Sequence, residues 1–326
     1  AITVNSSEVD DSIGILVDGA EDFVLTNNTI NYTGNSDGSA VNNAIRLEDA
    51  DGAVIEDNII NISIPSVPVT YLPPDWDATV LSEGIVVDTS DDVVLSNNTI
   101  NVDYNKVTGA YDSVYAVEFV DSDNAVINDN EITTNGNSYA YGLTLNGENF
   151  TVEGNNITTT GNNYANGIQI NGPASGNVSD NNIDAEAPSV VYPVYSYGKN
   201  VVTYTDNNIS GTSNSVYAME LFGTNETVKD NNIVANGNFT IGVASKSKNL
   251  VLENNTIIAN GTNKGTPTTG DSIKSETTGV KAVAGSTAIT NNTIISTGDS
   301  AVKTEASGYI ANNTLVANDT TGDAAV

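Results

Sequence analysis

The tripeptide Asn-x-Ile recurs along the whole chain, and this repeat constrains the fold more than any other feature. Eleven copies occur, the last of them with Leu in place of Ile. Five residues before each final Ile or Leu stands an apolar residue, and about 15 residues before it a small residue opens an alternating strand such as Gly84-Ile85-Val86-Val87. Each unit therefore indicates three short strands of period two separated by turns.

A unit of about 24 residues with three strands cannot bury an apolar face by itself, whereas stacked units can. Such stacking predicts an all-β parallel β-helix solenoid of about 11–12 coils, right-handed as parallel crossovers are. A propeller is the competing architecture, but its blades are antiparallel and need hairpins that this pattern lacks. We expect one domain over residues 1–326, with long loop insertions at about 63–82 and 263–278.

The first Asn of each tripeptide precedes the third strand, where the chain must turn sharply. Asn tolerates left-handed backbone angles and bonds neighbouring backbone groups through its amide. The chain contains 48 Asn but one Gln, and the position before the repeated Asn is always Asn, Asp or Gly. Both facts favour a structural role. The predicted ladder of stacked amides comprises Asn28, Asn58, Asn98, Asn130, Asn155, Asn181, Asn207, Asn231, Asn255, Asn292 and Asn313.

The Asn-Asn-Thr-Ile unit with a preceding Gly-Ile-x-Val strand resembles the right-handed parallel β-helix repeats of pectin-lyase-like and NosD-like proteins. It is most similar to the Asn/Thr/Ile-rich adhesin-like surface proteins of methanogenic archaea. The resemblance covers about Ile2 to Val316. It implies the fold and a place outside the cell, but a fold does not determine activity.

Composition excludes several kinds of chemistry. The chain has no Cys and no His, so disulfides, thiolate or His-ligated zinc sites and Ser-His-Asp triads are ruled out. Ten basic residues against 41 acidic ones argue against nucleic-acid binding. No apolar run is long enough to span a membrane. Since the chain begins with Ala1, we expect a mature or excised, exported polypeptide.

Acidic residues fill the turn between the first and second strands in the first four repeats. Stacked carboxylates repel each other, and Ca²⁺ is their natural counter-ion, although a solvated acidic face is the plainer interpretation. The candidate calcium ligands are Asp18, Asp22, Asp49, Asp51, Asp88, Asp91, Asp92, Asp121 and Asp123.

Charge is distributed unevenly along the chain. Residues 1–163 carry 27 acids and 2 bases, and residues 164–326 carry 14 acids and 8 bases, so the halves have net charges of −25 and −6. An uncapped β-helix also exposes unpaired strand edges at its ends. We therefore expect the partner to be a second copy, associated head to tail or laterally, or neighbouring repeats of a larger surface protein.

Asn-x-Ser/Thr sequons and tyrosines provide further candidate sites. The sequons expected in exposed turns, and hence available for glycosylation, are Asn5, Asn61, Asn149, Asn238, Asn260 and Asn318. Five tyrosines fall at similar distances before their repeat endpoints, so they are expected to stack along one edge, either as a packing ladder or as a sugar-binding strip. They are Tyr115, Tyr139, Tyr164, Tyr192 and Tyr217.

These observations predict a non-catalytic, extracellular structural protein, either a cell-surface rod or a subunit of a filament, sheath or surface layer. The first alternative is a carbohydrate-binding adhesin module. The second is a calcium-dependent polysaccharide lyase, for which Arg46, the single Arg, would supply the base. We expect Arg46 instead to pair with Glu48 or its neighbours at the surface.

Overall fold

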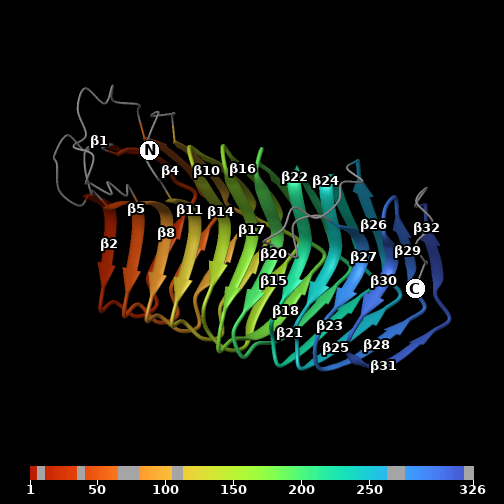
Figure 1. Ribbon diagram of the computed structural model, residues 1–326. Helices are drawn as coiled ribbons and strands as arrows, with labels where there is room; N and C mark the ends of the chain where they lie inside the picture. Colours follow the sequence, from red (N-terminus) through yellow and green to blue (C-terminus); the bar gives the residue numbers. More distant parts are fainter. Residues whose placement is uncertain (6–11, 35–40, 65–80, 105–112, 263–275, 319–326) are drawn as a thin grey trace, which may run out of the picture.

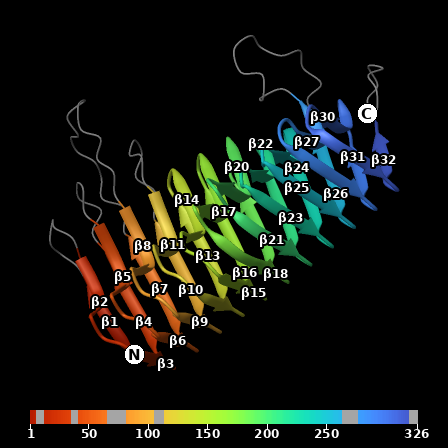
Figure 2. The same ribbon diagram turned by 90° about the horizontal axis from the view of Figure 1, so that it is seen from below.

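The computed structural model describes residues 1–5, 12–34, 41–64, 81–104, 113–262 and 276–318. In this part of the chain, strands wind into stacked coils along one axis, with the two termini at opposite ends of the stack (Figures 1 and 2). Every strand pairing is parallel, within one sheet of 21 strands and another of eleven. The predicted all-β parallel β-helix is therefore confirmed. The bulk of the expected loop insertions, residues 65–80 and 263–275, lies outside the described residues.

Each coil contributes three strands. The first strands are β2 (Ser12–Asp18), β5 (Val41–Glu48), β8 (Leu81–Asp88), β11 (Ser113–Val120), β14 (Tyr139–Leu145), β17 (Tyr164–Asn171), β20 (Val190–Tyr197), β27 (Thr277–Ala282) and β30 (Ser300–Thr304). The second strands are β3 (Val24–Thr26), β6 (Val54–Glu56), β9 (Val94–Ser96), β12 (Val126–Asn128), β15 (Phe150–Glu153), β18 (Ser175–Ser179), β21 (Val201–Thr205), β23 (Asn225–Lys229), β25 (Asn249–Glu253), β28 (Ser286–Thr290) and β31 (Ser307–Ala311).

The third strands are β1 (Ile2–Asn5), β4 (Thr29–Thr33), β7 (Ile59–Ile64), β10 (Thr99–Tyr104), β13 (Glu131–Gly136), β16 (Asn156–Gly161), β19 (Asn182–Glu186), β26 (Thr256–Gly261), β29 (Thr293–Ser296) and β32 (Thr314–Ala317). In two places a third strand continues into the next first strand as one long strand, namely β22 (Asn208–Leu221) and β24 (Asn232–Ser245).

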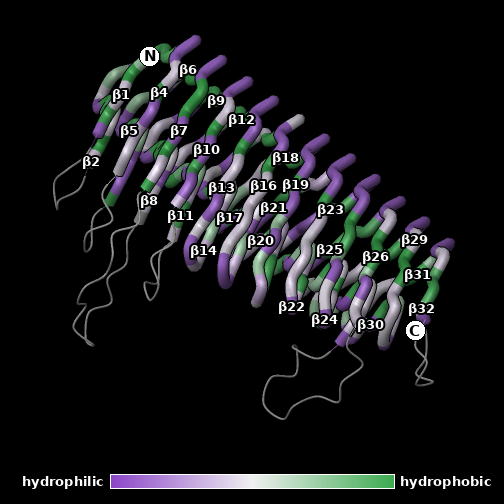
Figure 3. The backbone as a smooth tube through the Cα atoms, turned by 90° about the horizontal axis from the view of Figure 1, so that it is seen from above, coloured by the Kyte–Doolittle hydropathy of each residue, from purple (hydrophilic) through white to green (hydrophobic). Residues whose placement is uncertain are grey.

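Polar and apolar residues alternate along the strands (Figure 3), and the apolar ones point into the coil. The final Ile of the repeat is fully buried in each of the first ten copies, from Ile30 to Ile294. The last coil differs, because Ile310 is 38% exposed where its equivalents in the preceding nine coils are at most 2% exposed. The core is therefore continuous between neighbouring coils, and its apolar side chains become partly exposed at β31.

The predicted Asn ladder is confirmed. From Asn58 to Asn313, the side-chain oxygen of each ladder Asn accepts the backbone N–H of the ladder Asn in the preceding coil, beginning with Asn28, at 2.8 to 3.0 Å. The backbone prediction needs a correction, because the left-handed residue is the one before each ladder Asn. It is Asn27 in the first copy and Asn312 in the last, and Asn, Asp or Gly in every copy. The ladder Asn itself supplies the hydrogen bonds.

The Gly expected to open a first strand lies inside that strand in the structure, as Gly84 does in β8, and its lack of a side chain has a steric cause. A Cβ at Gly84 would lie 2.3 Å from the carbonyl oxygen of Ala116 in the next coil. The strand is bent at this point, because the paired register skips this position between β8 and β11. The bend leaves the residues on both sides of it, such as Tyr115 and Glu118, on the outer surface of the coil.

Candidate functional site

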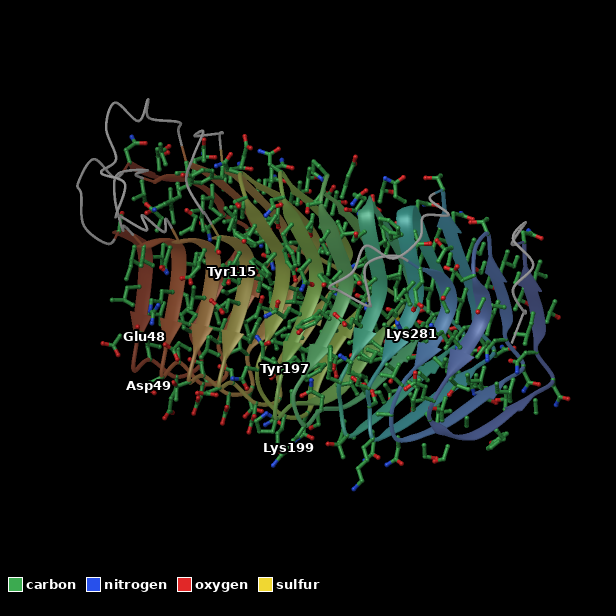
Figure 4. All side chains as sticks on the ribbon, viewed as in Figure 1. Glu48, Asp49, Tyr115, Tyr197, Lys199 and Lys281 are labelled. Carbon is green, nitrogen blue, oxygen red and sulfur yellow. The ribbon has the colours of Figure 1, made fainter. Side chains whose placement is uncertain are left out.

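The outer surface of the first strands, here called the first-strand face, carries chemically varied side chains in register. One row contains Glu83, Tyr115 and Tyr141 on β8, β11 and β14. Three residues further along each first strand, a second row includes Glu118 on β11, Gln169 on β17 and Tyr195 on β20. Figure 4 shows Tyr115, Tyr197 and Lys281 along this sheet. The turns below carry Asp49 and Lys199 in the same view.

Aromatic rings form a continuous strip across the middle of this face. Ring centroids are 4.4 Å apart for Tyr115 and Tyr141, and 5.7 Å apart for Tyr141 and Tyr164. Further contacts at 5.2 to 6.3 Å link Tyr164 through Tyr192 to the remaining rings. The strip comprises Tyr115, Tyr139, Tyr141, Tyr164, Tyr192, Tyr195, Tyr197, Tyr217 and Phe222.

The five tyrosines expected to stack do lie together, but not in one file. Tyr115 is in register with Tyr141 rather than with Tyr139, which pairs with Tyr164 two positions earlier along the strands. Tyr141, Tyr195, Tyr197 and Phe222 were missed. Spacing from the repeat endpoint selected tyrosines from two rows and left out these four residues, whereas counting every outward position on both sides of the bend would have found all of them.

Burial changes the chemistry of these phenols. Desolvation is the main cause that raises the pKa of Tyr115, Tyr164 and Tyr192, and neighbouring phenols add to it. The hydroxyl groups therefore stay protonated and can both donate and accept hydrogen bonds. Tyr197 lies at the other extreme, with 58% of its surface exposed. The strip thus offers ring surface at its open side.

A pair of carboxyl groups lies beside the strip at its N-terminal end. Glu83 is buried and hydrogen-bonded to Glu118, and the Asn43 amide donates to the Glu83 carboxyl at 2.8 Å. Burial, followed by the charge of Glu118, raises the pKa of Glu83 to about 8. Burial also raises the pKa of Glu118. The pair therefore holds a proton at neutral pH, because two adjacent carboxylates cannot both ionise cheaply.

Arg46 borders this pair. It forms ion pairs with Glu48 and, at 2.9 Å, with Asp88, so the expected pairing with Glu48 is present. Its charge also lowers the pKa of both Glu83 and Glu118, against the larger effect of burial. Because its guanidinium is held by two carboxylates, it is poorly placed to act as the base of a lyase.

A pocket of about 310 Å³ lies at the C-terminal end of the strip. Tyr217, Phe222 and Ile241 form apolar walls, and Lys246 lies 4.9 Å above the centre of the Phe222 ring. Glu220 also lines the pocket, and burial raises its pKa to about 7. This pocket was not identified from the sequence, because its lysines come from three different coils.

The acidic turns have a structural explanation. The carboxylates of Asp51, Asp91 and Asp123 each accept a backbone N–H from the turn of the next coil, at 2.6 to 2.8 Å. Several neighbours, among them Asp22 and Asp49, adopt the left-handed conformation that tight turns require. Among the described residues, no group of three or more acidic side chains is arranged to hold a metal ion. The calcium prediction for this row therefore gains no support.

The predicted glycosylation sites differ in accessibility. Asn5, Asn149, Asn238 and Asn318 are exposed, although Asn5 and Asn238 lie in strands. The expectation of exposed turns is wrong for Asn61 and Asn260, which are half-buried within β7 and β26. Both belong to rows of outward-facing amides on the third strands. Asn61 bonds the amides of Asn31 and Asn101 at 3.0 Å, and Asn260 donates to Asn236 at 2.9 Å.

The chain matches no protein-family model and no curated protein. It is similar to the solved Dettilon tailspike protein, with a TM-score of 0.35 and 12% identity, over 92% of this chain and 61% of that one. It is also similar to the catalytic domain of a GH87 alpha-1,3-glucanase in complex with tetrasaccharides, with a TM-score of 0.31 and 14% identity, over 94% of this chain and 64% of that one. It thus spans less than two thirds of either chain, and the similarity concerns the fold.

This comparison corrects one expectation. We expected a protein that is not an enzyme, but one of the similar chains is a glucanase catalytic domain, so that expectation is withdrawn.

The described residues contain no helix long and apolar enough to cross a membrane. The resemblance to methanogen surface proteins, the extracellular location and head-to-tail association remain predictions.

Proposed function

We propose that the protein binds a polysaccharide along the first-strand face. The aromatic strip is the observation that carries this proposal. Aromatic rings stack on the apolar faces of sugar rings, and tyrosine adds a hydroxyl group for the sugar hydroxyls. The strip extends over the five first strands from β11 to β22, which is four strand spacings or roughly 19 Å. An open strip of this length suits an extended polymer better than a small enclosed ligand.

Amide side chains between the rings support the same function. On β17, the Asn166 amide donates to Gln169 at 3.1 Å, and the Gln169 amide donates to Asn171 at 3.1 Å. Asn166 is itself buried, so the relay fixes the half-buried amides of Gln169 and Asn171 between the aromatic rows. A surface of oriented amides and phenols offers both donors and acceptors, as sugar hydroxyls require. These features favour carbohydrate binding over a purely structural rod.

The experiment compares Tyr195→Ala and Tyr197→Ala with the control Tyr309→Ala. Tyr309 is 62% exposed but lies on β31, away from the strip. Binding to a panel of polysaccharides would be measured by affinity electrophoresis. Each ring contact is worth about 1 kcal/mol, so each strip variant should weaken binding about fivefold and the double variant more. Binding to no polysaccharide, or equal loss in the control, would refute the proposal.

Cleavage of the bound glycan is a second candidate function, favoured by the carboxyl pair beside Tyr115. Glu83 would donate its proton to the glycosidic oxygen as the C–O bond breaks. Water would add to the sugar carbon and pass its proton to the Glu118 carboxylate. Carboxyl groups that activate water in this way stand roughly 6.5 to 9.5 Å apart, so this hydrogen-bonded pair must separate when sugar and water enter. Release of reducing ends by the protein, abolished in Glu83→Gln with binding retained, is expected; no release from any polysaccharide bound would exclude it.

A further inference from the structure

The pocket at the end of the strip concentrates positive charge in an acidic protein. Lys246, Lys281 and Lys303 all line it, and they represent three of the nine lysines in a chain of net charge −31. They come from successive coils, since Lys281 is in register with Lys303 and with Ala244, two residues before Lys246. These lysines are far apart in the sequence, and only the stacking of the coils brings them together.

The charges around the pocket are only partly balanced within it. Lys281 and Lys303 share the single carboxylate of Glu276, at 2.5 and 2.9 Å. Glu305 also lines the pocket, so carboxylates match the charges of these two lysines, and Lys246 is the ammonium group that a ligand anion would meet. Lys246 lies over the Phe222 ring, and its charge lowers the pKa of Glu220 against the effect of burial.

The apolar residues that line the pocket indicate the shape and polarity of the ligand. Tyr217, Ile241 and Ala244 form a small apolar cluster on the outside of the coil, with Tyr192 packed against it. The volume of about 310 Å³ lies at the lower end of small-molecule sites, which run from about 300 to 1,000 Å³. The pocket therefore offers room for about one ring with an apolar face and an anionic substituent.

The charge of the rest of the protein limits the charge that the ligand can carry. Residues 1–163, which include the strands that bear Glu83 and Tyr115, carry a net charge of −25. A densely charged polyanion lying along the whole face would be repelled there. An isolated anionic group placed at the C-terminal end of the strip would meet lysines instead.

We propose that this pocket binds a single anionic sugar residue of an otherwise neutral glycan. This inference rests on the proposed function and specifies its ligand. The anionic group is a carboxylate or a sulfate, since either accepts hydrogen bonds from ammonium groups. Neutral sugar units on one side of the acidic sugar would lie along the tyrosine strip. The glycan would therefore bind in one orientation along the coil axis.

Glu220 makes the pocket sensitive to pH. Its neighbours are Lys246, Tyr195 in register on β20, and Tyr192, and burial followed by the Glu220 charge raises the pKa of both phenols. Lys281, Lys303 and Glu305 line the same pocket. Since the pKa of Glu220 is about 7, its carboxylate is neutral in mild acid and negative in mild base. Anion binding should therefore weaken as pH rises from 6 to 8.5.

The test uses matched oligosaccharides of equal length: one neutral, one with a terminal uronic acid, and one with a terminal sulfated sugar. Titration calorimetry at pH 6 should show at least tenfold tighter binding of one of the two anionic forms, and the preferred form identifies the anion. Lys246→Met should remove this preference, so that the neutral and the anionic forms bind with similar affinity. Lys229→Met is the control, because Lys229 lies on β23 away from the pocket.

The outcomes separate the two proposals. If the neutral form binds and neither anionic form is preferred, or if Lys246→Met keeps the preference, the anionic subsite is wrong and polysaccharide binding stands. If none of the three oligosaccharides nor any polysaccharide of the panel binds, the proposed function itself fails. A preference that stays constant from pH 6 to 8.5 would overturn the role of Glu220.

Discussion

Asn181 allows the contribution of the amide ladder to be measured. It is 2% exposed, and its side-chain oxygen accepts both the backbone N–H and the amide of Asn155, at 2.9 Å. Its amide donates to the carbonyls of Val152 and Ser179 and to the Asn207 side chain, at 2.8 to 3.0 Å. Replacement by Ala removes all five bonds, and partners that have no other hydrogen bond are left unsatisfied.

The expected cost follows from these contacts. A protein hydrogen bond contributes about 1 kcal/mol net, and a buried group left without a partner costs about 1 to 3 kcal/mol. Several of the five partners have alternative bonds, so we expect Asn181→Ala to lower the unfolding free energy by about 4 kcal/mol. This is a large share of the roughly 5 to 15 kcal/mol that stabilises a typical domain.

Urea unfolding followed by circular dichroism measures this loss, with Asn182→Ala as the matched control. Asn182 is the next residue, is exposed, and takes part in an outer amide row through two bonds of 2.7 Å. Because water replaces exposed bonds, the control should cost less than about 1 kcal/mol. An Asn181→Ala variant no less stable than the Asn182→Ala variant would refute the view that the inner ladder holds the coils together.

Three further predictions concern charged groups. Arg46→Met should lower the unfolding free energy by about 1 kcal/mol in low salt, with the loss reduced by added salt, because Glu48 and Asp88 lose their shared counter-charge. Glu220 binds a proton more tightly in the folded than in the unfolded chain, so its contribution to stability falls as pH rises from about 4.5 to about 7. In urea unfolding, Glu220→Gln should therefore have the higher unfolding free energy at pH 8, by at most about 3 kcal/mol, and no advantage at pH 4.5. Asp91→Asn keeps the acceptor for the next turn and removes a negative charge, so chemical denaturation should show it at least as stable as the wild type, whereas Asp91→Ala should be less stable.

The repeat allowed much of the fold to be predicted. The period of the Asn-x-Ile tripeptide set the number of coils, and the buried Ile rows from Ile30 onward follow from the same spacing. The inner ladder was predictable because a turn that recurs in every coil places identical amides above one another. The position of the left-handed residue was assigned one place too late, since both positions favour Asn and only Asp and Gly at the earlier one distinguish them.

The candidate site was only partly predictable. Tyr115 and Tyr192 were identified by their distance from the repeat, but the bend in the first strand brings a second set of outward residues, including Tyr195, onto the same face. The Glu83–Glu118 pair joins residues 35 positions apart, and its shared proton depends on burial rather than on residue type. To predict contacts of this kind, one must know the number of residues that separates paired positions in neighbouring coils. This number changes with the length of each insertion.

Every segment that separates the described stretches within the chain follows a third strand and precedes a first strand, as between β7 and β8 or between β26 and β27. The large changes of coil length therefore fall at one corner, while the amide ladder and the buried Ile rows stay in register from coil to coil. A lineage of such proteins can gain or lose residues at this corner without re-optimising its interior. Because that corner adjoins the start of the first-strand face, variation there offers a route to new ligand preferences on an unchanged scaffold.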